Sequence, residues 1–415
     1  MEQIETPVTQ SSAPRNAPLQ RGTVLLMATA VGVVVANIYY IQPLLADIAH
    51  SFGLTVAHAG AIAMLSQAGT ATGMFLFVPL GDKFERRALV VTLLGCSFVS
   101  LLCFCFAPNI YCLAVASFAV GAFASTVHVL VPFAAHLAST EERGRVVGTM
   151  VSGILFGVLL ARTFSGSLGA LFGWRVVYGI AAVAMLALAA VLSTRLPASR
   201  PEHRISWPEL MRSTFALVRK HAMLRESALL GAIFFSAFSA FWTTLVFLLQ
   251  SPAYGCKNAS AVAGLFGLVG AAGASGAPTF GHLAARHGPR TTIRISLWVA
   301  MLSFLFLGFA GEHYAGLIVG VILMDLGIQV GHISNQTRIY GIDPAARSRL
   351  NMVYMSCYFT GGGMGSLLGA LCWNWAGWRG VCGFACAMLC LGLVAETWFD
   401  RAHGKATTPL DLPHA

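Results

Sequence analysis

Val78–Arg87 reads VPLGDKFERR and carries five charged side chains in ten positions. The whole chain of 415 residues has only 16 acidic residues and 26 Lys or Arg, and long apolar runs flank this stretch on both sides. A short, strongly charged turn between two apolar runs is typical of a loop that connects two membrane-spanning helices. The composition and the lengths of the other apolar runs test that interpretation.

The composition is that of an integral membrane protein. Hydrophobic residues make up 57% of the chain and charged residues 10%, whereas soluble domains have about 25% charged residues. In lipid the backbone must satisfy its own hydrogen bonds, which leaves helices or closed barrels. The apolar runs are about 20 residues or longer and do not alternate with polar residues, so we expect α-helices.

Twelve apolar runs are long enough to span a membrane, and we expect an all-α fold of twelve transmembrane helices. The first run is too long for the apolar part of a signal peptide and has a counterpart in the second half of the chain, so we interpret it as a spanning helix. The expected spans are residues 23–48, 57–79, 89–107, 111–137, 145–171, 175–194, 227–250, 258–280, 291–310, 314–340, 350–373 and 378–398.

Lys and Arg are distributed unevenly between the two ends of these helices. Of the 26, 22 fall on one side, three fall on the other, and Arg162 lies inside the fifth span. Because Lys and Arg accumulate in cytoplasmic loops, we expect both termini in the cytoplasm and the protein in the plasma membrane, the inner membrane of a bacterium. The net charge of +10 is then a topology signal, and we expect no nucleic-acid partner.

The polar segments set the expected domain boundaries. Residues 1–22 are rich in Pro, Ser, Gln and Thr and are expected to form a flexible cytoplasmic tail. Apolar spacing within residues 207–218 predicts a helix, which either lies on the inner membrane surface or belongs to a plain linker. The other expected units are an N-terminal six-helix bundle (23–194), a cytoplasmic linker (195–226), a C-terminal six-helix bundle (227–398) and a second cytoplasmic tail (399–415).

The two halves of the chain repeat each other. With a shift of 204 residues, Arg143–Arg145 coincides with Arg347–Arg349, and Gly173–Arg175 coincides with Gly377–Arg379. Six helices in each copy give both copies the same orientation, so the repeat is parallel, about an axis along the membrane normal. Parallel repeats of this kind place a binding site at their interface near the middle of the membrane, and they work by rocking one half against the other.

The charged stretch and the repeat resemble the major facilitator superfamily of secondary transporters. The signature of that family between helices two and three is G-x-L-[AG]-D-[RK]-x-G-[RK]-[RK]. The chain departs from it at Val78 and Glu85, where the family usually has Gly. The matching residues are Leu80, Gly81, Asp82, Lys83, Arg86 and Arg87.

A second copy of the signature lies in the other half, at Gly281–Arg290. It keeps both Gly positions, as Gly281 and Gly288, but has Ala285 in place of the Asp. The resemblance extends over residues 23–400 and implies two six-helix bundles that give alternating access to a small-molecule site.

One subgroup of the family is particularly similar around Asn37–Leu45, namely bacterial carriers for the efflux of drugs and sugars. Two features of proton-coupled drug antiporters are altered here. Ser117 stands where the resemblance implies an Arg in helix four, and Gly157-Val158 stands where it implies Gly-Pro in helix five. The chain therefore departs from the standard pattern of proton antiport.

Polar side chains inside the spans are the main candidates for a transport site, because an ionisable group at bilayer depth is costly unless it is paired or faces water. Asp325 begins a polar face on the tenth span, and the resemblance implies that helices one, four, seven and ten line the cavity. An ordinary packing or hydrogen-bonding role is the alternative for each residue. The candidates for a substrate or proton pathway are Asn37, Tyr40, Gln42, His128, Arg162, Trp242, Thr243, Asp325, Gln329, His332 and Gln336.

Arg162 and Asp325 are expected at the same depth. Arg162 lies ten positions before Phe172, and Asp325 lies eleven after Tyr314, which places both about 15 Å from the outer ends of their helices at 1.5 Å per residue. We hypothesise that Arg162 pairs with Asp325 or binds an anionic group of the substrate. A static pair inside the bundle is the alternative.

The resemblance also implies a gate. The acid at Asp82 would dock on the N-terminal end of helix eleven and stabilise one state of the cycle by about 0.3–1 kcal/mol, or up to about 2 kcal/mol if partly buried. Because Ala285 replaces the acid in the second copy, the latch should be one-sided. Glu85 is left without an assigned role. The expected gating residues are Gly81, Asp82, Lys83, Arg86, Arg87, Arg286, Gly288 and Arg290.

No catalytic or nucleotide-binding motif is present. The run Gly361–Gly363 lacks the Lys-Ser/Thr of a phosphate loop. We therefore expect no enzyme, no cofactor and no metal site, but a monomeric secondary transporter in the lipid bilayer that moves a small organic molecule, with protons as the coupling ion and efflux as the direction. The alternatives are uptake or exchange of a small organic acid, and a transporter-like sensor.

Overall fold

The computed structural model of the chain describes residues 20–139, 141–199, 207–285, 288–343 and 346–403. Those residues form helices and connecting turns, with no strand among them. The expected gating residue Arg286, most of the expected N-terminal tail and most of the C-terminal tail lie outside the described residues.

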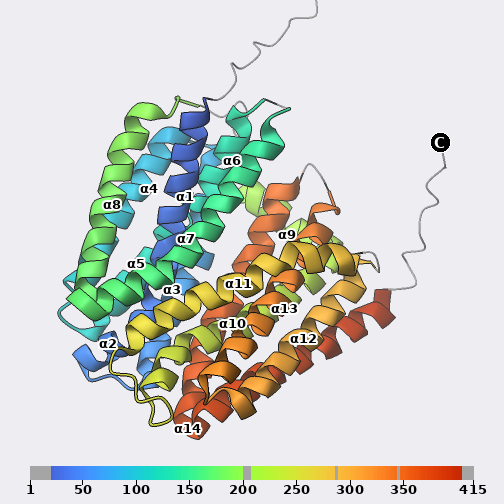
Figure 1. Cartoon of the computed structure of the whole chain (residues 1–415). Helices are drawn as coiled ribbons and strands as arrows, with labels where there is room; N and C mark the ends of the chain where they lie inside the picture. Colours follow the sequence, from blue (N-terminus) through green and yellow to red (C-terminus); the bar gives the residue numbers. More distant parts are fainter. Residues whose placement is uncertain (1–19, 140, 200–206, 286–287, 344–345, 404–415) are drawn as a thin grey trace, which may run out of the picture.

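In the first half of the chain, drawn in blue to green in Figure 1, the described residues form eight α-helices and one short 3-10 helix. The expected spans 23–48 and 111–137 are each interrupted. Pro43 has no N–H to donate to the carbonyl of Tyr39, where the first span breaks. The elements are α1 (Arg21–Tyr39), α2 (Ile41–Phe52), α3 (Val56–Phe77), η1 (Pro79–Asp82), α4 (Arg86–Cys105), α5 (Ile110–Ala124), α6 (Val127–Leu137), α7 (Arg143–Phe172) and α8 (Trp174–Arg195).

The break in the fourth span lies at Ser125 and Thr126. Their hydroxyls donate to the carbonyl oxygens of Ala122 and Phe123, both at 2.6 Å. Such back-bonding side chains loosen the regular pattern of backbone hydrogen bonds and bend helices.

The second half begins with the linker helix α9. Its elements are α9 (Trp207–Lys220), α10 (Ala222–Gln250), α11 (Ala259–Ala285), α12 (Pro289–Ala310), α13 (Tyr314–Tyr340) and α14 (Arg347–His403). The helix expected at 207–218 is therefore present, and its expected position on the membrane surface stays a prediction.

By length and composition, eleven helical segments of the described residues could cross a membrane. The last of them lies in α14, which has 57 residues. That is about 85 Å at 1.5 Å per residue, more than twice the hydrocarbon thickness of about 30 Å. The α14 backbone leaves the helical conformation at Ala376 and Gly377. The segment therefore holds the two expected spans 350–373 and 378–398, which gives the twelve-helix fold.

The internal repeat is visible in the backbone. Gly173 has φ +84° and Gly377 has φ +57°, a conformation that glycine adopts without steric cost. In both copies the next residue is a Trp whose indole donates a hydrogen bond, from Trp174 to Ser51 Oγ at 2.9 Å and from Trp378 to the Leu307 carbonyl at 2.8 Å. Equivalent positions of the two copies thus make the same sharp turn.

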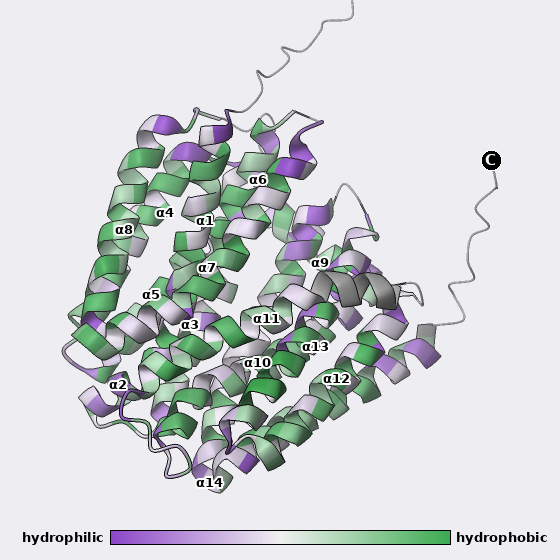
Figure 2. Cartoon of the chain, in the orientation of Figure 1, coloured by the Kyte–Doolittle hydropathy of each residue, from purple (hydrophilic) through white to green (hydrophobic). Residues whose placement is uncertain are grey.

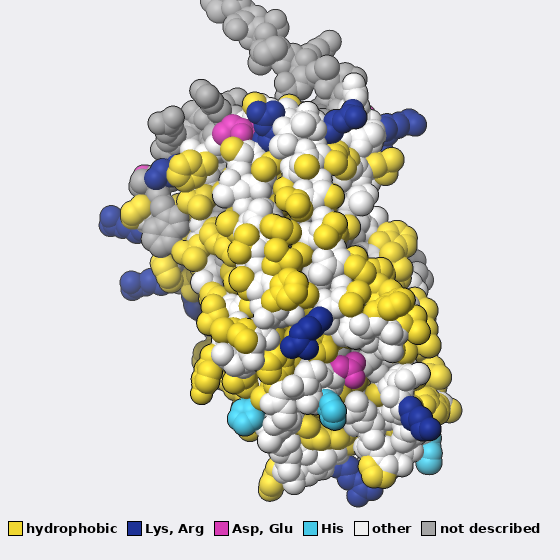
Figure 3. Space-filling model, turned by 90° about the vertical axis from the view of Figure 1, so that its left-hand side faces the viewer, with side chains coloured by type: hydrophobic (Ala, Val, Ile, Leu, Met, Phe, Trp, Pro, Cys, Tyr) yellow, Lys and Arg dark blue, Asp and Glu magenta, His cyan; other side chains and the backbone are white. Residues whose placement is uncertain are grey.

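The surface fits a lipid environment. In Figure 2 hydrophobic residues cover the lengths of the helices, and hydrophilic residues gather near their ends. Figure 3 shows hydrophobic side chains across the middle of one face, with Lys and Arg concentrated towards one end. We call the helix ends that carry Lys83, Arg143 and Arg349 the basic face, and the other ends the opposite face.

The two halves meet through α7 and α11 and through α3 and α14 (Figure 1). Gly166 on α7 lies so close to α11 that a Cβ atom there would be 2.3 Å from the Ser260 carbonyl oxygen. The Thr163 hydroxyl donates to the Gly264 carbonyl at 3.1 Å, and the Ser260 hydroxyl donates to the carboxylate of Asp47. These contacts join the two halves towards the opposite face.

Helix α9 contacts both halves at the basic face. Its Leu210 and Met211 pack with Met352 of α14 and with Phe75 of α3. Arg349 Nη1 donates to Ser213 Oγ of α9 at 2.9 Å. The linker therefore packs across the boundary between the halves.

Candidate functional site

Arg162 is a buried cation at the boundary between the halves. It projects from α7, and its side chain packs against Gly267 of α11, where a Cβ atom would be only 2.9 Å from Arg162 Cβ. Glycine at that position makes room for the long side chain. Arg162 Nε donates to Gln42 Oε1 of α2 at 2.7 Å, and Arg162 is only 4% exposed.

Three aromatic rings surround the guanidinium of Arg162. The distance from its Cζ to the ring centroid is 4.0 Å for Trp242, 5.0 Å for Tyr39 and 5.5 Å for Phe238. Cations are attracted to aromatic faces at such distances, more strongly where water is excluded. The rings come from α10 in the second half and from α1 in the first half, so both halves hold this one cation.

Asp325 lies beside the same tryptophan. It is 3% exposed on α13 and faces Gly270 of α11, where a Cβ atom would be 2.7 Å from Asp325 Oδ2 and 3.0 Å from Trp242 Cζ2. Gly267 and Gly270 are three residues apart and so share one face of α11. Arg162 and Asp325 thus lie against neighbouring positions of one helix.

The hypothesised ion pair is absent from this structure. Among the described residues no hydrogen bond or ion pair joins Arg162 to Asp325, and Arg162 Nη2 and Asp325 Oδ2 are both buried without a hydrogen-bond partner. Trp242, from a third helix, lies over Arg162 and close to the same position of α11 as Asp325. The expected equal depth of Arg162 and Asp325 stays a prediction.

We call Tyr39, Gln42, Arg162, Phe238, Trp242 and Asp325 the arginine cluster. Trp242 Nε1 is a third buried polar atom in it without a partner. Buried polar groups are normally hydrogen-bonded, and orphans of this kind are costly. Three orphans around one ring therefore point to a place where a ligand, a proton or water binds.

A second group of candidates gathers nearer the basic face. His332 Nδ1 lies 2.9 Å from the Tyr354 hydroxyl, and its ring centroid is 4.6 Å from that of Tyr358. His128 of the first half lies 6.4 Å from Phe359, centroid to centroid. We call these five residues the histidine cluster.

Aromatic rings connect the two clusters. Centroid distances are 6.0 Å from Trp242 to Phe238, 5.6 Å from Phe238 to Phe235 and 4.0 Å from Phe235 to Tyr358. The three residues of α10 lie on one helical face at spacings of three and four. That spacing in the sequence would have indicated Phe235 and Phe238, which were not among the predicted candidates.

The other predicted candidates are scattered around these clusters. Asn37 is buried, and its Nδ2 lies 3.4 Å from Met185 Sδ. Thr243 donates to Ser366 Oγ at 2.9 Å, and the Tyr40 ring lies 6.2 Å from that of Phe164.

On α13, Gln336 Nε2 lies 3.7 Å from Met355 Sδ, and Gln329 is half-buried. Among the described residues, no recorded contact joins Arg162 to any of these five candidates, which are Asn37, Tyr40, Thr243, Gln329 and Gln336.

The charged stretch Val78–Arg87 is built around Glu85. Its carboxylate caps α4 by accepting from the backbone N–H groups of Arg87 at 2.9 Å and Ala88 at 2.7 Å, and it also accepts from Ser199 N at 3.0 Å. Burial alone would raise the pKa of Glu85, but these three hydrogen bonds and the charge of Arg87 lower it below its usual value. Arg87 Nη1 donates to the Leu196 carbonyl at 3.3 Å.

Of the other expected gating residues, Arg86 Nε donates to the carbonyl of Gly81 at 3.2 Å, and Lys83 is exposed. The side chain of Asp82 lies outside what the structure describes, so the latch stays a prediction. Glu85 is the residue that sequence reasoning left unassigned. A carboxylate directly before a helix is a recognised cap, but its bond to Ser199 could not be read from the sequence.

The second copy of the signature belongs to an ionic network at the basic face. Gly288 precedes α12 with φ +90°. Arg290 pairs with Asp400 of α14 and lies 4.0 Å from Glu226. Glu226 in turn makes a buried two-point contact with Arg338, at 2.7 and 3.2 Å. The network braces α10, α12, α13 and α14 within the second half.

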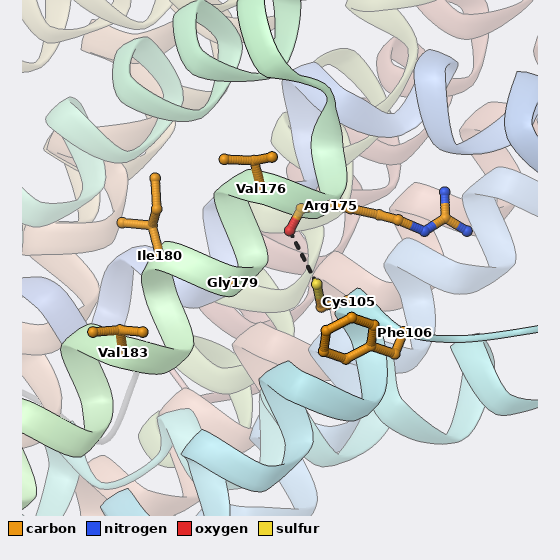
Figure 4. A pocket seen from close by; sticks show the side chains of 7 residues that line it. All are labelled: Cys105, Phe106, Arg175, Val176, Gly179, Ile180 and Val183. Carbon is orange, nitrogen blue, oxygen red and sulfur yellow. Dashed lines mark hydrogen bonds between the residues drawn. The ribbon is translucent and has the colours of Figure 1, made fainter.

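A surface depression lies away from both clusters, between α4 and α8 (Figure 4). The Arg175 guanidinium points away from it, while its backbone carbonyl accepts from Cys105 Sγ at 3.2 Å. Phe106 and Val183 at this depression are 74% and 64% exposed. The lining residues are Cys105, Phe106, Arg175, Val176, Gly179, Ile180 and Val183. Its apolar, outward-facing walls suit lipid contact rather than a polar substrate.

Comparison with known proteins places the chain in a family. A family model described as Major Facilitator Superfamily matches residues 27–279 and 258–414. The chain is 42% identical over 367 residues to the uncharacterized transporter YgaY of Escherichia coli O157:H7, covering 88% of this chain and 93% of that protein. It is 26% identical over 391 residues to a probable sugar efflux transporter of Haemophilus influenzae, covering 93% and 94%.

A solved structure has the same fold. It is a bacterial homologue of the human lysosomal transporter Spinster, in an inward-facing and unoccupied conformation, with TM-score 0.78, 15% identity, and coverage of 94% of this chain and 98% of that one. The predicted all-α fold of two repeated six-helix bundles is confirmed. The chain is thus a multi-pass membrane transporter that belongs to the Major Facilitator Superfamily.

Proposed function

We propose that the protein is a proton-coupled secondary transporter that exports a small organic molecule by alternating access. The observation that carries the proposal is the arginine cluster, in which a buried cation and a buried carboxylate of opposite halves lie around Trp242 with unpartnered polar atoms. A site built from both halves changes when they rock apart. The similarity to the probable sugar efflux transporter of Haemophilus influenzae supports the outward direction.

Asp325 is the proposed proton carrier. It is buried in α13, and Arg162 and Tyr358 are the charged or titratable groups close enough to interact with it electrostatically. A carboxylate in this setting changes its interaction with Arg162 when it takes up a proton. A gradient of one pH unit supplies about 1.4 kcal/mol per proton, which supports about a tenfold concentration gradient of a substrate exchanged one for one.

The proposed orientation places the basic face in the cytoplasm of a bacterial cell, with the protein in the inner membrane as a monomer. The excess of Lys and Arg at that face supports it. Helix α9 and the ionic network of Glu226 and Arg338 then lie on the cytoplasmic side.

Uptake or exchange of a small organic acid is the second candidate. It is favoured by one observation, that Arg162 has no carboxylate partner within the described residues. Direction and substrate charge are separate properties, so each needs its own measurement.

Flux in proteoliposomes under an imposed pH gradient tests the proposal. We expect a compound from a panel of sugars, drugs and organic acids to move against its gradient when protons move the other way. Asp325→Asn should abolish gradient-driven flux and retain exchange of substrate across the membrane. Glu312→Gln, which removes an exposed carboxylate on the opposite face, is the matched control. Flux that ignores the gradient, or an Asp325→Asn variant with normal coupling, would overturn the proposal.

A further inference from the structure

Among the described residues no carboxylate makes a direct ion pair with Arg162, although Asp325 of the same cluster is close enough to interact with it electrostatically. Arg162 Nε is bound to the neutral carboxamide of Gln42 at 2.7 Å, and Trp242 covers a face of the guanidinium at 4.0 Å. Nη2 is buried without a partner. A buried charge without a direct ion pair is costly, and such groups are normally paired. The side chain is therefore held in place with one edge left for a ligand.

The open edge selects the chemistry of that ligand. A guanidinium binds a carboxylate in its own plane through two parallel N–H···O bonds. Because Gln42 occupies Nε and a ring covers a face, the edge formed by the two terminal nitrogens remains for such a contact. This two-bond contact is planar, so it favours a carboxylate over a spherical ion.

The surroundings limit the charge and shape of the ligand. The cluster holds one cation and one carboxyl group, so the single carboxylate of a ligand is compensated when Asp325 carries a proton, and a second negative charge on the ligand would not be. The other side chains around the guanidinium are the rings of Tyr39, Phe238 and Trp242, all 7% exposed or less. Rings of this kind favour an apolar or aromatic body on the ligand.

We propose that the transported substrate is an organic monocarboxylate with an apolar body, whose carboxylate binds the terminal nitrogens of Arg162 and whose body packs on Phe238 and Trp242. The proposal rests on the transport function proposed above and specifies its substrate class. Because Arg162 belongs to the first half and both rings belong to the second, the bound acid contacts both halves at once.

Thermal unfolding of the purified full-length protein tests this inference without measuring transport. The probes are benzoate, phenylacetate and hexanoate, each compared with its own amide, which has the same body without the charge. We expect at least one acid to raise Tm in a saturable manner while its amide does not. In Arg162→Gln the affinity for that acid should fall about 10- to 100-fold, the size of a lost charged hydrogen bond.

Two further variants keep the test decisive. Arg162→Lys retains the charge but not the planar fork, so its affinity should lie between those of the wild type and Arg162→Gln. It also serves if Arg162→Gln does not fold. Arg175→Gln removes an exposed Arg from α8 and should bind the acid as the wild type does. Equal stabilisation by acid and amide, no stabilisation by any acid, or unchanged binding in both Arg162 variants would overturn the inference.

The outcome separates substrate class from coupling. If an acid binds through Arg162 but its flux ignores the pH gradient, the inference holds and proton coupling fails. If a neutral or cationic compound is driven by the gradient while no acid binds, the coupled transport holds and the inference fails.

Discussion

The guanidinium of Arg162 lies 4.0 Å from the ring centroid of Trp242. The cation belongs to α7 of the first half and the ring to α10 of the second, so this contact crosses the boundary that opens and closes in a rocking transporter. In the proposed rocking motion we expect this contact to break and re-form in each cycle. Its strength, about 0.5–2 kcal/mol for a cation over an aromatic ring, is small enough for a step that reverses.

Two substitutions of Trp242 should show how far transport depends on its aromatic ring and how far on its indole N–H group. Trp242→Phe keeps an aromatic face over Arg162, so we expect reduced but measurable transport and a loss of about 1 kcal/mol in stability. Trp242→Leu removes the face and should abolish transport. Flux in proteoliposomes and Tm measure both effects. Trp298→Phe, on the lipid-facing side of α12 where Trp298 is 49% exposed, is the control. Normal flux in Trp242→Leu would contradict the prediction.

The crossing of α7 and α11 should not tolerate a methyl group. At Gly166 a Cβ atom would lie 2.3 Å from a backbone oxygen of Ser260, so Gly166→Ala must push the helices apart at a cost of about 1–3 kcal/mol. We expect a lower Tm and slower flux. Gly148→Ala lies on the same helix with nothing within 4 Å and should be neutral or stabilising by up to about 1 kcal/mol. Indistinguishable variants would show that this crossing is looser than described.

Loss of Glu226 should destabilise the second half. Its carboxylate and the Arg338 guanidinium are 3% and 4% exposed, and Glu226→Gln leaves a buried cation uncompensated at a cost of about 3–5 kcal/mol. The exposed pair Glu142–Arg145, at 2.5 Å, should contribute only about 0–1 kcal/mol, so Glu142→Gln is the control. Chemical unfolding measures the free energy of unfolding of both variants. Similar losses in Glu226→Gln and Glu142→Gln would show that burial does not determine what an ion pair contributes here.

Glu85 should make stability depend on pH in the acid range. Its pKa is lower in the folded protein, so its contribution is complete above the unfolded value of about 4.3 and is lost as the pH falls through the folded value. Glu85→Gln should therefore be less stable than the wild type at neutral pH, by about 1 kcal/mol for a weakened cap, and the difference should shrink below about pH 4.

Thermal unfolding at several pH values measures this effect of Glu85. Glu312→Gln changes an exposed glutamate on the opposite face and should leave the pH profile as it is. A constant difference between Glu85→Gln and the wild type at all pH values would mean that the charge of Glu85 plays no part.

The spans and the repeat could be predicted because they depend on local properties. A run such as 227–250 is recognisable from its own length and apolarity, and Gly377 stands out because Gly173 precedes the same Trp-Arg pair. The division into two bundles follows from one polar linker. None of this requires knowledge of which side chains meet.

The site was predictable only in part, because it depends on contacts between residues that lie far apart in the chain. Depth along a helix placed Arg162 and Asp325 at one level, but which side chains contact them depends on the rotation of α10 and α11. Trp242 and the glycines of α11 therefore could not be placed beside them in advance. Glu85 is similar, since Ser199 lies 114 residues away in the chain.

The packing of α9 against Phe75 and Met352 affects how the two bundles can move apart. A linker without contacts between its ends would follow any motion of the two bundles. A helix that packs against both bundles must slide or detach when they separate. We therefore expect the length and the apolar contacts of α9 to limit how far the basic face can open, in addition to joining the two halves.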